Sequence, residues 1–504
     1  MQTDISFQGI AERKQKNTPK LLLTNRIFNW GPLELIILFT ILQLAVTLLT
    51  DGFCLSFDEA IWHYIGRNWL RNGLVPYDGG IDNKSPLMFI LFGISDRLFG
   101  VNYWFPRVVG TLCQSAGIYY LYKITSSLTG RTGGIIAMTI YALSLLWQVT
   151  AGKYTAVTET FEVTLVIISF YRYCTGQNKK DFFISGFLSG LGFAFRFSAL
   201  FGALAIFIAL ARHNLKTGYY FVLGGLAAVC LFAAAIYISG INLNDFILYS
   251  LTDNFSQGSI THHSVMWKLE NSFDKFFNSE FVLFYPGLVG YFLFNTQSRA
   301  LTLWLIFELM GIIIIGLFAK EHFKDLLPVL SIINAITFAQ LIGQFKVPAK
   351  ALLFVIWLCF FPKLLEPLIA FKKLFIAESI TGGSGEQSIE TARKKLGLWV
   401  KSNTDEEDRV LVMGNAGAQV QVYSERLSPT AYFSTTQTSL AKARFFNELK
   451  INQPELIIIP GPADYQNSVA KDLRTFLDRI ILNNYHLEKT LNGHSVYRKK
   501  NISN

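Results

Sequence analysis

Two adjacent carboxylates, Asp58 and Glu59, are the first residues whose types could carry out chemistry, and Asp82 and Lys84 follow them. A carboxylate can remove the proton of an acceptor hydroxyl, and an ammonium can hold a phosphate while it leaves. Carboxylates also stabilise the positive charge that develops at a sugar carbon during displacement. Group transfer from a phosphate-bearing lipid is therefore one of several chemistries that these residues could perform. Helix capping by the carboxylates and snorkelling by Lys84 are the alternatives.

Further ionisable residues lie at the predicted ends of apolar segments. Glu159 begins one such segment, and Arg196 lies in a break between two others. A carboxylate is costly at the mouth of a membrane span, so Glu159 is expected to line a site or to pair with Lys153 or Arg196. Arg196 is a candidate for a second phosphate contact. Lys320 and His322 follow a later apolar segment and could contact phosphate or a metal ion, although a lone histidine is more often structural.

The composition shows which kind of structure must position these residues. The 504 residues are 51% hydrophobic, 15% aromatic and only 16% charged, with a mean hydropathy of +0.35. A soluble domain usually contains about 25% charged residues. The composition thus excludes a disordered chain, a fibrous array and an ordinary cytosolic enzyme, and requires lipid as the solvent over much of the chain.

A membrane span needs roughly 20 apolar residues, or somewhat fewer when its ends snorkel. The sequence predicts an α-helical polytopic membrane protein with about eleven such spans. They are expected near residues 33–49, 104–122, 133–149, 160–173, 182–195, 198–211, 218–238, 281–294, 301–318, 326–340 and 351–368. Residues 182–211 are interpreted as two short spans with Arg196 between them, because one long span would disturb the charge pattern of the later loops.

The distribution of charge predicts how the protein is oriented. The formal charge is +10, and Lys and Arg lie mostly in the short loops of one side and in the arm formed by residues 1–32. This side is expected to be cytoplasmic, and no nucleic-acid partner is predicted. Two long polar loops, residues 51–103 and 240–280, are then extracytoplasmic and are expected to carry function.

The sequence after residue 370 has a different character. A Gly/Ser-containing linker, residues 371–385, leads to a small soluble α/β domain at 386–504. We predict helices at 388–401, 439–450 and 471–481, strands at 409–413 and 456–459, and a hairpin at 485–497 that turns at Asn492-Gly493. The glycines of 414–417 favour a turn at a strand end over a nucleotide-binding loop, because no complete glycine fingerprint is present.

The ordered motifs of the first long loop resemble those of GT-C glycosyltransferases, most closely the family 39 branch. That branch includes dolichyl-phosphate-mannose-protein mannosyltransferases and the bacterial aminoarabinose transferase of lipid A. The loop motifs are Asp58-Glu59-Ala60, Gly73-x-x-Pro76-Tyr77-Asp78, Asp82-x-Lys84-x-Pro86-Leu87 and Gly100-x-Asn102 with Arg107. Thr158-Glu159-Thr160 and Glu321-His322-Phe323 with Leu327-Pro328 resemble two further elements of the family.

The resemblance implies a GT-C fold and a role for each candidate residue. Asp58 would be the catalytic base, and Glu59 would orient Asp58 or the acceptor. Lys84 would hold the donor phosphate, with Arg196 and Lys320 as further phosphate contacts. The remaining site candidates are Asp82, Glu159 and His322. Some relatives bind a metal ion, and no ligand spacing in this chain requires one, so a divalent cation is left open.

The predicted function is transfer of a sugar, with inversion, from a polyprenyl-phosphate donor to a hydroxyl of a glycan, lipid or protein acceptor. The site and the C-terminal domain would lie on the extracytoplasmic face of the cell inner membrane. A transporter or flippase of lipid-linked glycans is the alternative; it predicts inverted repeats and polar residues at mid-span, and no convincing repeat is found. A non-catalytic envelope assembly protein is a second alternative.

Overall fold

The structure is a computed structural model that describes most of the chain. The described residues are 31–49, 53–146, 154–252, 264–277, 280–294, 298–315, 320–346, 348, 350–359, 365, 389–433 and 442–500. The predicted N-terminal arm, the linker at 371–385 and Lys153 lie outside these residues, apart from the last two positions of the arm.

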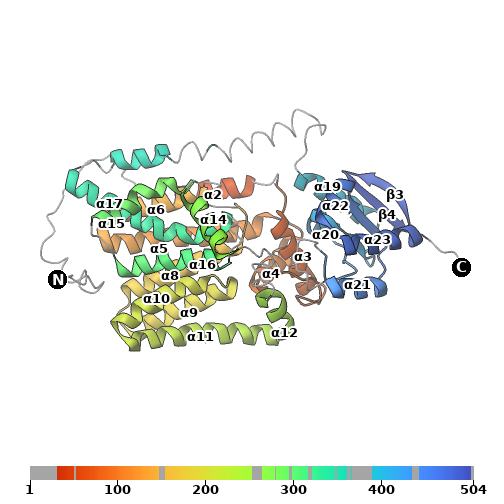
Figure 1. Cartoon of the computed structure of the whole chain (residues 1–504), viewed down its shortest axis with the longest axis horizontal. Coiled ribbons are helices and arrows are strands. Elements are labelled where there is room, and N and C mark those ends of the chain that lie inside the picture. The colour runs from red at the N-terminus through yellow and green to blue at the C-terminus, as the bar shows by residue number, and fades with distance from the viewer. Residues whose placement is uncertain are drawn as a thin grey trace.

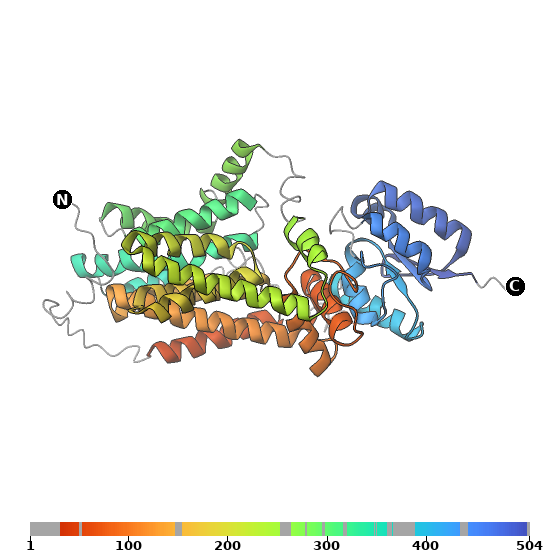
Figure 2. The ribbon, with the colours of Figure 1, turned by 90° about the horizontal axis from the view of Figure 1, so that it is seen from below.

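A bundle of long apolar helices forms the larger part of the molecule (Figure 1). The helices of the bundle are α2 (Pro32–Leu49), α5 (Trp104–Thr129), α6 (Arg131–Leu146), α8 (Thr158–Thr175), α9 (Lys179–Phe195), α10 (Ala199–His213), α11 (Leu215–Ile238), α15 (Tyr285–Leu293), α16 (Arg299–Ile315) and α17 (Leu327–Phe345). Most of these helices run side by side along the long axis of the molecule, as Figure 2 also shows.

Each predicted span overlaps one of these helices or the helix Lys350–Cys359. Within the described residues, three helices are long and apolar enough to cross a membrane, namely Pro32–Leu49, Leu215–Ile238 and Glu321–Phe345. The other predicted spans stay predictions. Two separate helices flank Arg196, because α9 ends at Phe195 with an extended Arg196 and α10 begins at Ala199.

The first loop region, which we define as residues 53–103, contains α3 (Phe57–Leu70) and α4 (Pro86–Phe99). Ser56 caps α3 and Ser85 caps α4, where Pro86 occupies the first turn. The two helices approach closely at Gly66 and Gly93, where a Cβ on Gly66 would lie 2.2 Å from the Phe89 carbonyl oxygen. This close contact makes α3 and α4 one rigid unit.

Shorter elements connect the later helices. They are α12 (Leu243–Phe246), a π-helical turn (Ile247–Thr252), α14 (Val265–Phe277) and 3₁₀ turns at Glu280–Phe284 and Lys320–Leu326. The turn at Lys320–Leu326 leads into α17 and brings several charged residues to the end of the bundle that lies next to the first loop region.

The C-terminal domain is a small α/β sandwich. Its elements are α19 (Ile389–Ser402), β1 (Val410–Val412), a 3₁₀ turn (Gly414–Ala416), α20 (Gly417–Ser424), α21 (Lys442–Ile451), β2 (Leu456–Pro460), α22 (Pro462–Ser468), α23 (Lys471–Asn484), β3 (Tyr485–Leu491) and β4 (His494–Lys499). The sheet order is β1-β2-β4-β3, with β1 parallel to β2 and the other pairs antiparallel. Asn492 and Gly493 have positive φ angles of 48° and 74°, as a two-residue hairpin turn requires.

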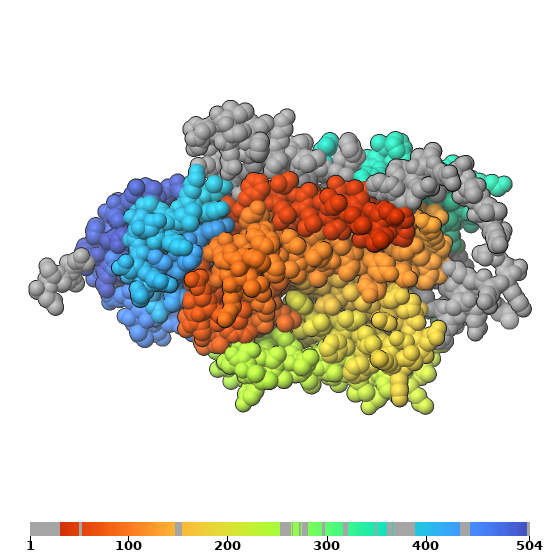
Figure 3. Space-filling model, turned by 180° about the vertical axis from the view of Figure 1, so that it is seen from behind, coloured from red at the N-terminus to blue at the C-terminus, as the bar shows by residue number. Residues whose placement is uncertain are grey.

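The first loop region and the C-terminal domain share one hydrophobic core. Buried Tyr64 of α3 packs on Phe433 with ring centroids 4.3 Å apart, and Leu411 and Val422 of the domain belong to the same cluster. Figure 3 shows the loop region lying directly against the domain, with α2 along the adjoining edge of the bundle. The domain is therefore docked on the loop and does not stand apart from it.

Candidate active site

Asp58 occupies the first turn of α3, at the end of the loop region that faces the bundle. Ser56 forms a capping box with Glu59, since the Ser56 side chain accepts from the Glu59 amide and the Glu59 carboxylate accepts from the Ser56 amide. A helix N-terminus favours a negative charge. The Asp58 side chain is only partly buried, so it is accessible to a substrate.

Glu59 has a different environment, because it is fully buried and forms a bidentate pair with Arg107 of α5. The Arg107 nitrogens lie 2.9 and 2.7 Å from the two Glu59 oxygens. Those oxygens also accept from the amides of Ala156 and Ser56. Since each oxygen accepts two hydrogen bonds, Glu59 joins α3, α5 and the start of α8, and we expect a positioning role for it.

Asp82 and Lys84 lie near Asp58 in space. The Trp62 indole nitrogen donates to Asp82 over 2.8 Å. Burial raises the pKa of Asp82, while the nearby charge of Lys84 lowers it and that of Asp58 raises it. The Lys84 ammonium donates to the Asn83 side chain over 2.9 Å and forms no ion pair with a described carboxylate. This leaves Lys84 suited to an anionic ligand.

Arg196 is held by carboxylates from two other elements. Its guanidinium lies 2.8 Å from Asp325, 3.3 Å from Glu159 and 3.5 Å from Glu162. The ion pair between Glu159 and Arg196, one of two predicted alternatives, is thus present in the structure. With three acidic partners, Arg196 is poorly placed to offer its charge to a phosphate, and we expect it to fix the carboxylates.

Glu159 links this group to the loop region. Besides Arg196, the charges of His322 and Lys84 act on Glu159, so His322 also belongs to the site. The backbone of Lys320 begins the turn that carries His322, and its side chain lies outside what the structure describes. The structure therefore brings Asp58, Asp82, Lys84, Glu159, Arg196 and His322 together from four parts of the chain.

Sequence reasoning missed three charged residues of this group. Glu162 and Asp325 are buried partners of Arg196. Lys324 is a buried amine whose ammonium lies 3.4 Å from the Thr160 hydroxyl. A signal was available, because each of the three lies next to a recognised motif. Glu162 lies one helical turn after Glu159, and Lys324 and Asp325 shortly precede Leu327-Pro328. The charge of Lys324 interacts with Glu159 and Asp325, so Lys324 belongs to the same group of residues.

The residues fit a divalent cation poorly. Among the described residues, no group of three or more His, Cys, Asp or Glu side chains could hold a metal ion. The clustered carboxylates Glu159, Glu162 and Asp325 are directed at the Arg196 guanidinium, which takes the place that a cation would occupy.

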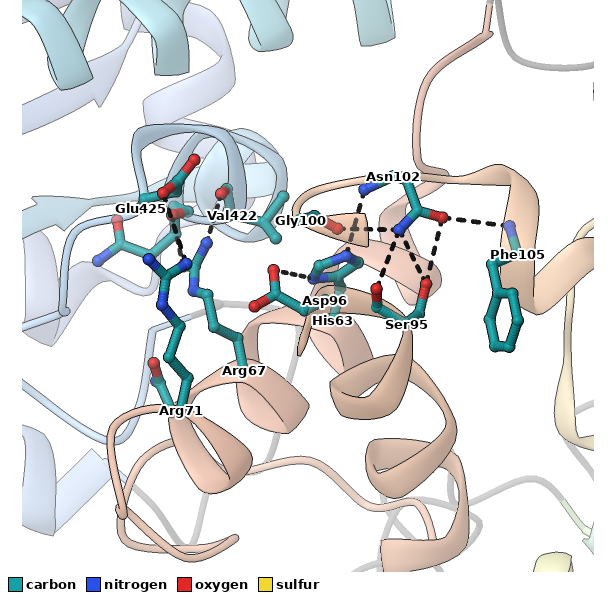
Figure 4. Close-up of polar contacts among 12 residues, drawn as sticks. His63, Arg67, Arg71, Ser95, Asp96, Gly100, Asn102, Phe105, Val422 and Glu425 are labelled. Atoms are coloured by element: carbon teal, nitrogen blue, oxygen red, sulfur yellow. Dashed lines mark hydrogen bonds and ion pairs between the residues drawn. The ribbon is translucent and has the colours of Figure 1, made fainter. Parts of the chain in front are cut away.

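A second polar cluster, around His63, Asp96 and Asn102, lies inside the loop region (Figure 4). His63 of α3 accepts from the Asn102 amide through Nε2, and its Nδ1 lies 3.6 Å from the Asp96 carboxylate of α4. Burial lowers the pKa of His63 to about 3 and raises the pKa of Asp96. His63 is therefore neutral at physiological pH, and the Asn102 side chain fixes the turn by contacts with Ser95, Gly100 and Phe105.

The sequence matches a family model for dolichyl-phosphate-mannose-protein mannosyltransferase over residues 83–238. No curated protein matches the sequence. Among solved structures, ArnT from Cupriavidus metallidurans bound to undecaprenyl phosphate is 13% identical with a TM-score of 0.64, over 93% of this chain and 98% of that chain.

The apo state of the same protein is 12% identical with a TM-score of 0.59, over 92% of this chain and 97% of that chain. An oligosaccharyltransferase of Archaeoglobus fulgidus, solved with Zn and sulfate, is 10% identical with a TM-score of 0.56, over 84% of this chain and 67% of that chain. The chain therefore shares the fold of these solved structures, and residues 83–238 resemble the mannosyltransferase family model.

The shared fold confirms the predicted fold class, a helical membrane protein with a small C-terminal α/β domain. The family model, together with these neighbours, indicates the predicted enzyme class, a glycosyltransferase. These comparisons favour a glycosyltransferase over the transporter alternative. At these identities the neighbours show the fold, and the roles of individual residues rest on the geometry described above.

Proposed function

We propose that this GT-C glycosyltransferase moves a sugar from a polyprenyl-phosphate donor to an acceptor hydroxyl on the extracytoplasmic face, with inversion. The observation that supports the proposal best is the placement of a partly exposed Asp58 near Lys84, whose charges both act on Asp82. A general base and a phosphate-binding amine at one site are the two groups that this reaction needs.

In the proposed reaction the acceptor hydroxyl gives its proton to the Asp58 carboxylate as its oxygen bonds to the anomeric carbon. The bond between that carbon and the phosphate oxygen breaks, and the electron pair stays on the phosphate, where Lys84 and Lys324 compensate the charge. Asp82 stabilises the positive charge on the sugar ring. A single displacement of this kind inverts the configuration at the anomeric carbon.

The comparisons support a lipid-linked donor. The ArnT neighbour was solved with undecaprenyl phosphate, and the archaeal oligosaccharyltransferase AglB with an inhibitory peptide and a dolichol-phosphate. We extend the polyprenyl-phosphate donor to this chain and keep a glycan, a lipid or a protein as acceptor classes. The motif order of the first loop region and its docked C-terminal domain are consistent with this extension.

Incubating the purified protein with labelled polyprenyl-phosphate sugars tests the reaction. We expect transfer or slow donor hydrolysis by the wild type, and a loss of about 100-fold or more in Asp58→Asn because the general base is removed. Asp78→Asn is the matched control, since Asp78 lies in the same loop but is exposed and pairs with Arg444 of the C-terminal domain. Equal activity of Asp58→Asn and Asp78→Asn would contradict the base assignment.

Labelling from outside the cell tests the orientation. The five native cysteines are first replaced by serine or alanine, because Cys230 and Cys359 are exposed. A membrane-impermeant maleimide should then label Glu407→Cys in the C-terminal domain and fail to label Lys216→Cys in the first turn of α11, both at exposed positions. The opposite labelling pattern would reverse the proposed orientation.

A further inference from the structure

Helix α20 of the C-terminal domain packs against α3 close to the end that carries Asp58. Two side chains one turn apart on α20 hold the backbone of Leu55, three residues before Asp58. The Gln419 amide nitrogen donates to the Leu55 carbonyl over 3.1 Å, and the Leu55 amide donates to the Tyr423 hydroxyl over 2.9 Å. Leu55, Gln419 and Tyr423 are all buried, so these contacts are not exchanged with solvent.

The orientation of the Gln419 side chain is itself fixed. Arg393 of α19 donates to the Gln419 carbonyl oxygen over 2.6 Å. An arginine cannot accept a hydrogen bond, so the oxygen of Gln419 must face it and the amide nitrogen must face Leu55. Two helices of the C-terminal domain thus cooperate in one contact with the loop region.

Further contacts hold α3 along its length. Arg67 of α3 donates to the Val422 carbonyl over 2.8 Å, and the Ser428 amide donates to the Tyr64 hydroxyl over 2.8 Å. Figure 4 shows Arg67 reaching from α3 toward Val422. These contacts fix the body of the helix, whereas Gln419 and Tyr423 act at its first turn, next to the capping residue Ser56.

We infer that Gln419 and Tyr423 are positioning residues for Asp58, which makes the C-terminal domain a part of the catalytic site. The inference rests on the proposed function, because it assumes that Asp58 is the base. Leu55 and the Ser56 cap determine where α3 begins, and the Asp58 carboxylate extends from the first turn of that helix. Loss of the contacts at Leu55 would let this turn shift or fray.

The inference predicts a change in kcat and not in the KM for the donor. A misplacement of about 1 Å in a catalytic group can cost about 100-fold in rate, and loss of one of two contacts is expected to cost about tenfold. The segment that carries Lys84 is held separately, since the Ile81 amide donates to the Ala431 carbonyl and the Tyr77 hydroxyl to the Lys84 carbonyl. Donor binding should therefore be unaffected.

The test uses the full-length protein and two variants that remove one contact each. Tyr423→Phe deletes the hydroxyl that accepts from Leu55. Gln419→Glu keeps an oxygen for Arg393 but places a second oxygen, which cannot donate, against the Leu55 carbonyl. Tyr465→Phe is the matched control, because it deletes one hydroxyl from the same domain, where Tyr465 donates to Asp478 over 3.1 Å, away from α3.

We expect kcat to fall about tenfold in Tyr423→Phe and Gln419→Glu, with an unchanged donor KM and a wild-type kcat in Tyr465→Phe. Hydrogen exchange supplies a readout besides activity. A peptide covering residues 55–59 should exchange about tenfold faster in Tyr423→Phe than in the wild type or in Tyr465→Phe, because one protecting hydrogen bond is gone.

Two results overturn the inference by itself: an active wild type whose kcat is the same in Tyr423→Phe, or a variant that changes only the donor KM. A drop in kcat of equal size in Tyr423→Phe and Tyr465→Phe also overturns it, because the effect would then be a general loss of stability. A wild type that transfers no sugar from any polyprenyl-phosphate donor refutes the proposed function itself, and the two failures are thus distinguishable.

Discussion

Gly66→Ala is expected to separate α3 from α4 and so to displace the helix that carries Asp58. A Cβ at this position would lie 2.2 Å from the Phe89 carbonyl oxygen and 2.5 Å from the Gly93 nitrogen. Ordinary van der Waals contact begins at 3.4 Å, so the two backbones must move apart by about 1.2 Å. Neither atom belongs to a flexible side chain, so only a shift of a whole helix can make the room.

Overpacking of this kind typically costs about 1–3 kcal/mol in stability. The displacement is of the size at which a catalytic group can lose about 100-fold in rate. We therefore expect a lower midpoint of thermal unfolding in detergent, together with a transfer rate at saturating donor reduced by about 100-fold.

Gly343→Ala is the control for this experiment. A Cβ on this exposed glycine of α17 meets no atom within 4 Å. Alanine has the higher helix propensity by up to about 1 kcal/mol, so the thermal midpoint should stay or rise and the rate should not change. If Gly66→Ala matched Gly343→Ala in both measurements, the close contact between α3 and α4 would not position the site.

Three further predictions concern buried ionisable residues. Glu59→Gln should lower the free energy of unfolding by about 3–5 kcal/mol, because Arg107 is left buried without its counter-charge. The thermal midpoint should fall accordingly, and a midpoint as high as that of a surface variant would contradict this prediction. Burial lowers the pKa of His63 to about 3, so between about pH 3 and 6.5 this group binds more protons in the unfolded chain than in the folded one. The folded state is therefore destabilised as the pH drops through that range. The free energy of unfolding of the wild type minus that of His63→Gln should be about 2 kcal/mol smaller at pH 5 than at pH 8. Thermal midpoints of both proteins measured across this pH range test the prediction, and parallel pH profiles would refute a neutral, buried His63. Lys324→Met should raise the donor KM about tenfold if Lys324 compensates the phosphate charge, and an unchanged KM would show that it serves only its buried neighbours.

Local patterns in the sequence predicted much of the fold. Each predicted span overlaps a described helix, and the break at Arg196 separates α9 from α10. In the C-terminal domain, Asn492-Gly493 correctly placed the hairpin of β3 and β4. Helix α20 was missed, because its first residue is a glycine in a glycine-containing turn and its short sequence shows no amphipathic pattern once both faces are buried.

The candidate site was predictable as a list of residues and not as an arrangement. Motif order identified Asp58, Lys84 and Glu159; the charges of Asp58 and Lys84 both act on Asp82, and that of Lys84 also acts on Glu159. It predicted that Glu59 orients Asp58 or the acceptor but did not predict its buried partner Arg107, which lies 48 residues later. Asp325 was not considered, since its partner Arg196 lies 129 residues away.

The sequence by itself determined that lipid is the solvent, where the helices run and which charges lie at their ends. These properties depend on composition and on periodicity within about 20 residues. Only the tertiary structure decided the partner of each buried charge and the docking of α20 on α3, which joins residues more than 350 positions apart. A buried ion needs a counter-charge within a few ångströms, and which residue supplies it depends on how the helices pack, a property that no local stretch of sequence contains.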